Sequence, residues 1–535
     1  MKNNLFTEVK VLDTSYNTFD LTHDKKMSFN MGQLIPNCVI ETIPGDNFNI
    51  NSNNLIRLAP MLAPMMHKVD VFQHFFYVPT RILWPSAPEF FSENENNPPV
   101  FPTIDVNEIA QQQSQILNPG DTLDYFGIPT RQYSEALPIS AVPFAGYAKI
   151  WDEFYRDQNL QPKIDFNLTD GDNTSLFLAN NLNTPLIRAW EKDYFTSSLP
   201  FVQKGSPVTI PLGTSADITY DNTGTTYLKS NLGQTLVFPG IADAKVQGFG
   251  GDIGQLEQKG AGTSPNIGLR IDNSEQLSVD LSSATSATIN DLRLAFKMQQ
   301  YLELSARTGT RYTEYLRGHW NVMSSDRSLQ RPVYLGGSKS PLIVSEVLQT
   351  SETNTAVTPQ GNMSGHGYAV SNANSFNYKC EEHGYIIGLV SILPKPVYMN
   401  GIHKHFLRKN KFDFYHPVFA NLGEQAVQNI ELFVSDDPVA DYGTFGYQAR
   451  WAEYRDLPST IHGQFRTDLE FWHMARDFSS LPQLNANFIE CDPTTRIFAV
   501  QSLPGEPLVH NVWATFLHQV KVGRKMPMFG IPQII

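Results

Sequence analysis

The sequence has few cysteines, no long apolar run and a low share of charged residues. It holds 3 cysteines in 535 residues, and because they are far apart and in no C-x-x-C pair, neither a disulfide framework nor a zinc knuckle is indicated. We expect Cys38, Cys380 and Cys491 to be buried free thiols. No stretch reaches the roughly 18 apolar residues of a membrane span, and the start of the chain lacks the apolar core of a signal peptide. The sequence therefore predicts a soluble protein with no membrane partner.

Catalytic signatures are missing too. There is no G-x-S-x-G, no H-E-x-x-H and no G-x-x-x-x-G-K-[ST], the minimal motifs of a serine hydrolase, a zinc protease and a P-loop enzyme. His403 and His405 would lie on one face of a strand, but two ligands are too few for a metal site. The adjacent carboxylates of Glu381 and Glu382 would point apart in an extended chain, whereas glycosidase acids face each other. We expect no catalytic residue, no metal and no cofactor.

The sequence is rich in proline, glycine and aromatic residues. Its 35 prolines, 35 glycines and 12% aromatic content are typical of short strands joined by many loops. We expect strands at Leu34–Ile43, Val69–Val78, Tyr385–Leu393, Ile430–Ser435, Arg496–Gln501 and Leu508–Val522. The second of these is apolar on both alternating faces, which predicts a strand covered on both sides. Early strands, a long interruption and late strands predict an all-β fold of two sheets with insertions.

Helical periodicity marks two segments inside that interruption. Apolar side chains share one helix face after Pro143, and they recur every three or four positions over 289–306 until Gly309. Residues 213–286 differ from their surroundings in being rich in Gly, Thr, Ser and Asn. We expect a single domain, 31–535, after an N-terminal arm, 1–30. Its expected parts are an irregular and helical insertion at 80–211, a surface insertion at 213–286, a helix at 289–306, a loop insertion at 351–375 and a C-terminal arm at 526–535.

Two kinds of contact surface can be proposed from the side chains. Residues 305–353 set arginines among aromatics, which suits polar contacts between chains, and the apolar, proline-broken end of the chain suits docking. The expected subunit-interface residues are Arg311, Arg317, Arg331, Trp320, Phe529 and Ile531. The net charge of −13 means that any DNA contact must be local. Candidates are Lys404, Arg408, Lys409, Lys521, Arg524 and Lys525; a solvated face or an acidic neighbour is an equally good explanation of them.

Several long strings carry a resemblance to a known family. They are TGTRYTEYLRGHW (308–320), SLQRPVYLGG (328–337) and SEVLQT (345–350), with NMGQLIPNCVIETIPGDNF (30–48), PFAGYAKIWDEFYRDQNL (143–160) and KFDFYHPVFANLGE (411–424) in the same order. In these the chain resembles the major capsid protein of the Microviridae, the small single-stranded DNA phages, in their gokushovirus-like branch. The resemblance covers nearly the whole chain and fades mainly between Gly213 and Ser286.

The resemblance implies a structural protein with an eight-stranded viral jelly-roll sandwich that carries large loop and helical insertions. It implies pentamers and a T=1 icosahedral shell around circular single-stranded DNA, in a virion assembled in the cytoplasm of a host bacterium. The expected partners are the chain itself, the DNA, internal scaffolding, DNA-pilot and small DNA-binding virion proteins, and a host-cell surface receptor. The insertion at 213–286 is expected to form a surface protrusion for host attachment, with Tyr220, Tyr227, Phe238 and Phe249 as its candidate residues.

Two other functions remain open from the sequence. A carbohydrate-active β-sandwich enzyme would need a facing pair of carboxylates in a cleft, which the sequence does not display. A glycan-binding adhesin would share the sandwich but would not need the arginine-rich segment. Residues 213–286 could also be a flap that stabilises a neighbouring subunit instead of a protrusion.

Overall fold

The computed structural model describes residues 15–92, 98–112, 116–208, 289–348, 350, 363–500 and 509–529, and four short strands between 217 and 280. The chain divides into two compact units. One comprises residues 1–204 and 303–535, and the other comprises Gly205–Leu302. Among the described residues, no helix has both the length and the apolar character needed to cross a bilayer.

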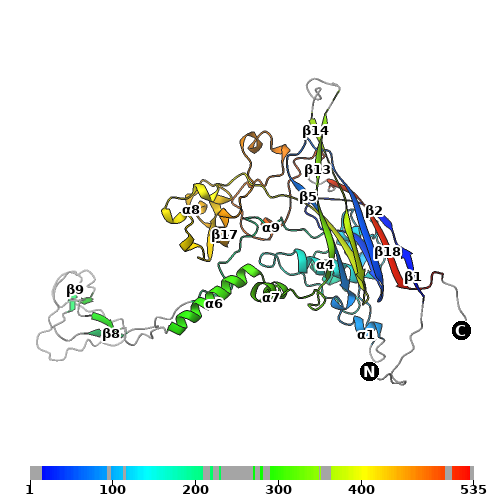
Figure 1. Cartoon of the computed structure of the whole chain (residues 1–535), viewed down its shortest axis with the longest axis horizontal. Coiled ribbons are helices and arrows are strands. Elements are labelled where there is room, and N and C mark those ends of the chain that lie inside the picture. The colour runs from blue at the N-terminus through cyan, green and yellow to red at the C-terminus, as the bar shows by residue number, and fades with distance from the viewer. Residues whose placement is uncertain are drawn as a thin grey trace, which may run out of the picture. The chain divides into compact units, whose positions relative to one another are not determined.

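The first unit is built on two antiparallel sheets, seen on the right of Figure 1. One sheet has the order β1-β18-β4-β14-β13, and β2 also pairs with β18. Its strands are β1 (Tyr16–Asp20), β2 (His23–Phe29), β4 (Asn47–Leu58), β13 (Ile343–Leu348), β14 (Met363–Lys379) and β18 (Val512–Lys525). The other sheet has the order β12-β5-β15-β3. Its strands are β3 (Ile35–Thr42), β5 (Val69–Pro79), β12 (Val333–Pro341) and β15 (Gly384–Pro394).

The inner faces of the two sheets pack together as a β-sandwich. Ile56 and Phe516 of the six-stranded sheet share a buried cluster with Val71, Val390 and Ile392 of the four-stranded sheet. Along β18, buried and exposed positions alternate, which is the pattern of a strand with one face in the core and one face in water. The antiparallel sheets therefore agree with the β-sandwich predicted from the sequence, although the chain also carries a substantial share of helix. The eight-stranded jelly-roll connectivity remains a prediction.

A helical insertion covers the outer face of the four-stranded sheet. Its elements are η1 (Thr80–Ile82), α1 (Ala87–Phe91), β6 (Thr103–Asp105), α2 (Val106–Gln111), α3 (Thr122–Phe126), β7 (Pro138–Ser140), α4 (Val142–Ile150), the π-helix η2 (Trp151–Tyr155) and α5 (Thr174–Ala179). The helix predicted after Pro143 is α4, and its Tyr147 packs in one cluster with Phe76 and Ile387 of the sheet. Ten of the eleven residues of β5 are buried, which confirms that this strand is covered on both sides.

A second lobe, residues 395–500, has little regular structure (yellow to orange in Figure 1). Its elements are η4 (Lys404–Phe406), η5 (Lys411–Asp413), η6 (Pro417–Phe419), β16 (Glu424–Gln428), η7 (Asn429–Glu431), α8 (Pro438–Asp441), β17 (Thr444–Ala449), η8 (Ala452–Tyr454), η9 (Gly463–Arg466), η10 (Glu470–Trp472) and α9 (Ala486–Ile489). Tyr194 and Phe195 insert between Leu432, Phe445 and Phe488 to form its separate core. This lobe therefore folds around a segment of the helical insertion.

Helix α6 (Ile289–Thr308) confirms the helix predicted at 289–306. Gly309 follows it with a φ of 101°, a left-handed conformation that glycine adopts without strain. Helix α7 (Tyr312–Trp320) begins three residues later. The second unit contains the strand pairs β8 (Asp217–Tyr220) with β11 (Leu277–Asp280), and β9 (Leu228–Ser230) with β10 (Leu269–Ile271).

Several sequence predictions need correction. Part of the predicted loop at 351–375 belongs to β14, and part of the predicted arm at 1–30 forms β1 and β2. These strands were missed because they hold many Ser, Asn, Asp and Lys residues, which obscure the alternation of apolar and polar side chains. No strand forms at 430–435 or at the described residues 496–500, where a 3-10 turn and bends occur instead.

Replacing Tyr147 by phenylalanine tests how the insertion is fixed to the sheet. The Tyr147 hydroxyl donates to the carbonyl of Leu34 at 2.7 Å and accepts from the N–H of Leu186 at 2.9 Å, and it is fully buried. Tyr147→Phe leaves both backbone groups unpaired, so we expect the free energy of unfolding of the soluble chain to fall by about 1–3 kcal/mol. Tyr312→Phe, at an exposed tyrosine, is the control. Equal denaturation midpoints for the two variants would contradict this prediction.

Candidate assembly and nucleic-acid surfaces

The side chain of Arg311 is largely buried against other parts of its own chain. Its Nη2 donates to the carbonyl oxygens of Asp152 and Arg156 at 2.5 and 3.0 Å, at the end of η2. The backbone N–H of Arg311 donates to the side chain of Gln158 at 3.0 Å. The guanidinium thus satisfies carbonyls that the end of a helix leaves without partners. The contacts of Arg311 fix α7 against the helical insertion, and its expected role at a subunit interface remains a prediction.

Arg331 is likewise held within the chain. It forms an ion pair with Asp326 at 2.6 Å and lies over the ring of Phe154 at 4.8 Å. Arg317 and Trp320, in contrast, are exposed on α7, with 66% of the Trp320 surface accessible, and Met323 just beyond them is 83% accessible. A tryptophan that one chain leaves in water is typical of the centre of a protein interface. These two interface candidates therefore remain predictions that the geometry allows.

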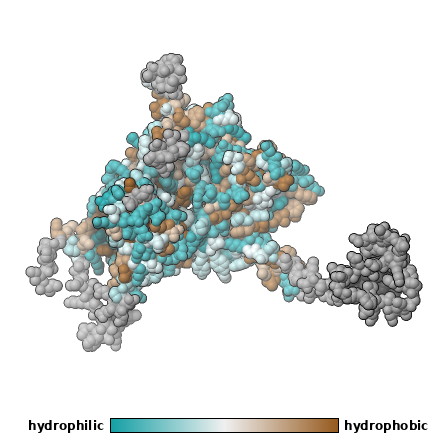
Figure 2. Space-filling model, turned by 180° about the vertical axis from the view of Figure 1, so that it is seen from behind, coloured by the Kyte–Doolittle hydropathy of each residue, from teal (hydrophilic) through white to brown (hydrophobic). Residues whose placement is uncertain are grey.

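The second lobe carries a larger exposed apolar surface, which we call the apolar lobe surface. Its residues are Phe406, Phe412, Phe414, Val418, Leu422, Val439 and Leu457. Val418 is 89% accessible, and Figure 2 shows hydrophobic surface on the side where this lobe lies. Soluble monomers rarely leave so many large apolar side chains uncovered in one region, so we expect this surface to contact another molecule. The sequence analysis missed it because exposure cannot be read from an irregular segment.

Three of the six DNA-contact candidates are held by buried carboxylates. Lys404 pairs with Glu431 at 3.3 Å, Arg408 with Glu453 at 3.1 Å and Arg524 with Asp46 at 2.6 Å. Burial alone raises the pKa of Glu453, but hydrogen bonds from Gln425 and Arg408 and the charge of Lys404 hold it below its ordinary value. A cation that is already paired with a buried carboxylate would have to break that ion pair, or share its charge, to bind phosphate.

The other three candidates, Lys409, Lys521 and Lys525, form no ion pair with a described residue. Lys409 lies 5.5 Å from the ring centre of Tyr442, and Lys521 is on the outward face of β18. These three lysines are therefore the better candidates for phosphate contacts.

The remaining candidates fall in different places. His403 and His405 are in contact with each other at the start of the 3-10 helix η4, so the strand expected there is wrong. Phe529 is exposed at the end of the described chain. Ile531, Tyr227, Phe238, Phe249 and the side chain of Tyr220 lie outside the described residues. Cys38, Cys380 and Cys491 are buried free thiols, as predicted.

One feature was not predicted at all, a cleft of about 1190 Å³ beside the outer face of β5 and β12. Its lining includes Arg188, Tyr155, Trp190 and Tyr334. The Arg188 guanidinium lies 4.2 Å from the ring centre of Phe72 and donates to the Ser391 hydroxyl, and no described carboxylate forms an ion pair with it. Such a site can hold an anion that carries a flat ring. No sequence motif predicts this cleft, because its lining comes from segments far apart in sequence.

Comparisons with known proteins agree with one another. A family model described as "Capsid protein (F protein)" matches residues 7–534. The chain is 37% identical to "Capsid protein VP1" of Bdellovibrio phage phiMH2K, over 98% of this chain and 97% of that protein. It is 33% identical to "Capsid protein VP1" of Chlamydia phage 1, over 99% and 97%. Identity to "Capsid protein VP1" of Spiroplasma virus 4 is 31%, over 96% and 94%.

The pairing of Arg524 with Asp46 yields a test of structural against DNA-binding roles. Asp46 is fully buried and takes two hydrogen bonds from the guanidinium, at 2.6 and 3.1 Å. Arg524→Gln leaves a buried carboxylate without its counter-charge, so we expect the free energy of unfolding to fall by about 3–5 kcal/mol. Lys521→Gln, three residues earlier on the same strand, should leave unfolding by denaturant unchanged. Equal stability of the two variants would show that Arg524 is not a structural residue.

Proposed function

The chain belongs to the capsid protein (F protein) family and is a structural capsid protein of a Microviridae-type bacteriophage, and from this premise we propose how it builds its shell. Copies join into pentamers and then into a small T=1 icosahedral shell around a circular single-stranded DNA genome. Assembly takes place in the cytoplasm of the host bacterium, with scaffolding, DNA-pilot and small DNA-binding proteins of the virion as partners.

The observation that carries the proposal is the apolar surface that one chain leaves uncovered. The apolar lobe surface and the exposed face of α7 with Trp320 both lie in the first unit, outside its two sheets. Water-exposed groups of this size are costly unless another subunit covers them, since burial yields about 25 cal/mol per Å² of apolar surface. In a closed shell each copy presents such a surface to a neighbour on every side. We propose that these are the main subunit contacts.

The genome requires a second, cationic kind of surface. The chain carries a net charge of −13, so we propose that DNA is held at local sites and not over the whole inner wall. Lys409, Lys521 and Lys525 suit this role because no described carboxylate forms an ion pair with them, although Lys521 lies opposite Asp20 on β1. Arg188 in its aromatic cleft adds a place where a phosphate and a base could bind together.

The insertion at 213–286 is proposed as the part that meets the host. It lies within a unit, Gly205–Leu302, that contacts mainly itself, and its composition is that of exposed loops. If the insertion binds a host-cell surface receptor, this unit alone would act as the adhesin that the sequence left open as an alternative function. The alternative of a carbohydrate-active enzyme loses its basis, because the family consists of structural proteins.

Removing side chains of the apolar lobe surface should block assembly without unfolding the chain. In the double variant Phe406→Ser with Val418→Ser, both changed side chains are largely exposed, so the soluble chain should melt as the wild type does. We expect at least tenfold fewer particles by sedimentation and electron microscopy, because each shell loses the same contact many times over. Val418→Ile, which keeps the apolar surface, is the control. Wild-type particle yield from the double variant would refute the assignment of this surface.

Deletion of the insertion separates attachment from assembly. A chain in which a short Gly/Ser linker replaces Thr214 to Thr285 should still fold, since the cost of closing a loop rises slowly with its length. We expect particles that form in normal yield but adsorb poorly to host cells. Loss of particles with a soluble, folded subunit would instead identify the insertion as a flap that stabilises a neighbour.

A further inference from the structure

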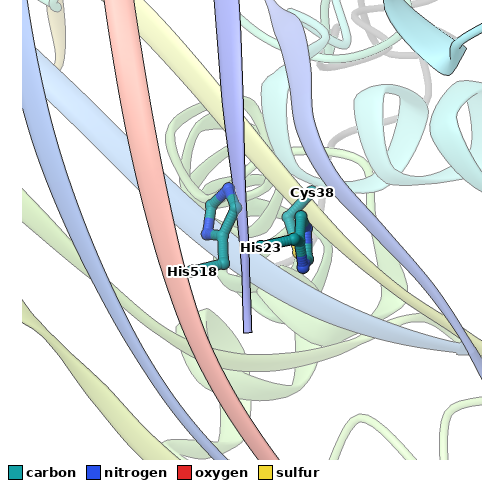
Figure 3. Close-up of side chains that lie close together, drawn as sticks. All are labelled: His23, Cys38 and His518. Atoms are coloured by element: carbon teal, nitrogen blue, oxygen red, sulfur yellow. The ribbon is translucent and has the colours of Figure 1, made fainter. Parts of the chain in front are cut away.

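Three side chains with metal-binding atoms, contributed by both sheets, lie close together. They are His23 of β2, Cys38 of β3 and His518 of β18, and one ligand atom from each lies within 4.8 Å of the other two. Figure 3 shows them side by side, each reaching in from its own strand. Strands β2 and β18 belong to the six-stranded sheet and β3 to the four-stranded sheet. The cluster therefore connects the two sheets, and it connects the two ends of the chain.

A bulge in β3 puts an additional polar group beside this cluster. Gly388 of β15 pairs with Cys38 and the next residue, Leu389, pairs with Pro36, so Asn37 is the extra residue. A Cβ on Gly388 would lie 2.7 Å from Asn37 Oδ1 and 2.9 Å from Cys38 Cβ, so both side chains crowd the same point. Asn37 is fully buried, and neither atom of its amide has a hydrogen-bond partner. An unpaired buried amide is destabilising, and a bound ion or water would relieve that cost.

The histidines already have the surroundings of metal ligands. His23 Nδ1 lies 2.9 Å from the carbonyl of Leu21, and His518 lies 3.0 Å from both the Ser52 hydroxyl (Nδ1) and the Asn37 carbonyl (Nε2). Metal-bound histidines almost always donate their second N–H to a carbonyl or a similar acceptor, which fixes the tautomer. The pattern leaves His23 Nε2 free to bind. Both nitrogens of His518 are hydrogen-bonded, so one of them must give up its partner to bind the ion while the other keeps its hydrogen bond.

We propose that His23, Cys38 and His518 bind one Zn²⁺ ion, with the Asn37 amide oxygen or a water molecule as the fourth ligand. Two imidazoles and one thiolate form a donor set that selects Zn²⁺ over Mg²⁺ or Ca²⁺, which prefer oxygen. Zinc–ligand bonds of roughly 2.0–2.3 Å require ligand atoms about 3.5 Å apart. The three side chains must therefore close by about 1 Å, and His23, near the N-terminal end of its strand, can move most easily.

Binding exchanges a proton for the metal. As the zinc–sulfur bond forms, the Cys38 thiol releases its proton to solvent, and the imidazoles bind in their neutral form. The ammonium of Lys25, which donates to the carbonyl of Pro36 at 3.2 Å, adds a positive charge nearby.

The experiment uses the purified full-length chain, stripped with a chelator and then titrated with Co²⁺ and with Zn²⁺. Bound Co²⁺ should show the visible bands of a tetrahedral site and a near-ultraviolet thiolate-to-cobalt band, and Zn²⁺ should displace it at one ion per chain. Because His23 lies at an edge, His23→Gln should fold normally and bind at least tenfold more weakly. Cys38→Ser should lose the thiolate band.

Cys380→Ser and His366→Gln are the matched controls, since both residues lie outside the cluster, and their titrations should equal that of the wild type. The proposal is overturned if the wild type binds neither ion at micromolar concentration. It is also overturned if His23→Gln and Cys38→Ser bind as the wild type does, because the ions would then be adventitious. The outcome is independent of shell assembly, as the site is built from one chain.

Discussion

The pairing of β18 with β4 is the constraint on which the rest of the structure depends. Twelve consecutive residues of β18, from Val512 to Gly523, pair with β4, and the same strand pairs on its other side with β1 and β2. The six-stranded sheet is therefore incomplete until β18 pairs between β4 on one side and β1 and β2 on the other. The connections between these strands, such as residues 80–332 and 395–511, can vary in length at modest cost, because loop-closure entropy grows slowly with the number of residues. This explains how one sandwich can carry a helical insertion, a second lobe and a separate unit.

Within this frame, arginine and lysine serve mainly to fix the chain to itself. Arg311 satisfies carbonyls at the end of η2, Arg524 neutralises buried Asp46, and Arg408 neutralises buried Glu453. These contacts stabilise irregular segments that have no sheet or long helix to order them. What remains for contacts with other molecules is largely apolar, and it lies on the second lobe and on α7. A division of this kind suits a subunit that must fold alone and then associate.

The sequence predicted the regular elements whose side chains alternate clearly, such as β5, β15, α4 and α6. It did not predict β1, β2 or β14, since their many polar residues hide the period of two. The contacts that Arg311 makes within its own chain were not predicted, because arginine beside aromatics suits any carbonyl-rich pocket, inside a chain or between chains. Asn37 shows another limit. Its amide has no hydrogen-bond partner among the described residues because of a one-residue register shift opposite Gly388. No local sequence pattern predicts that shift.

We propose that the apolar surfaces left uncovered by one chain are covered in the shell. Hydrogen–deuterium exchange, measured on the unassembled subunit and on assembled particles, tests this proposal. Backbone amides at residues 404–457 and in α7 should exchange markedly more slowly in particles, while those of β4 and β18, already protected by pairing, should exchange alike in both forms. Equal exchange at 404–457 in subunit and particle would contradict the claim and show that these surfaces remain in water.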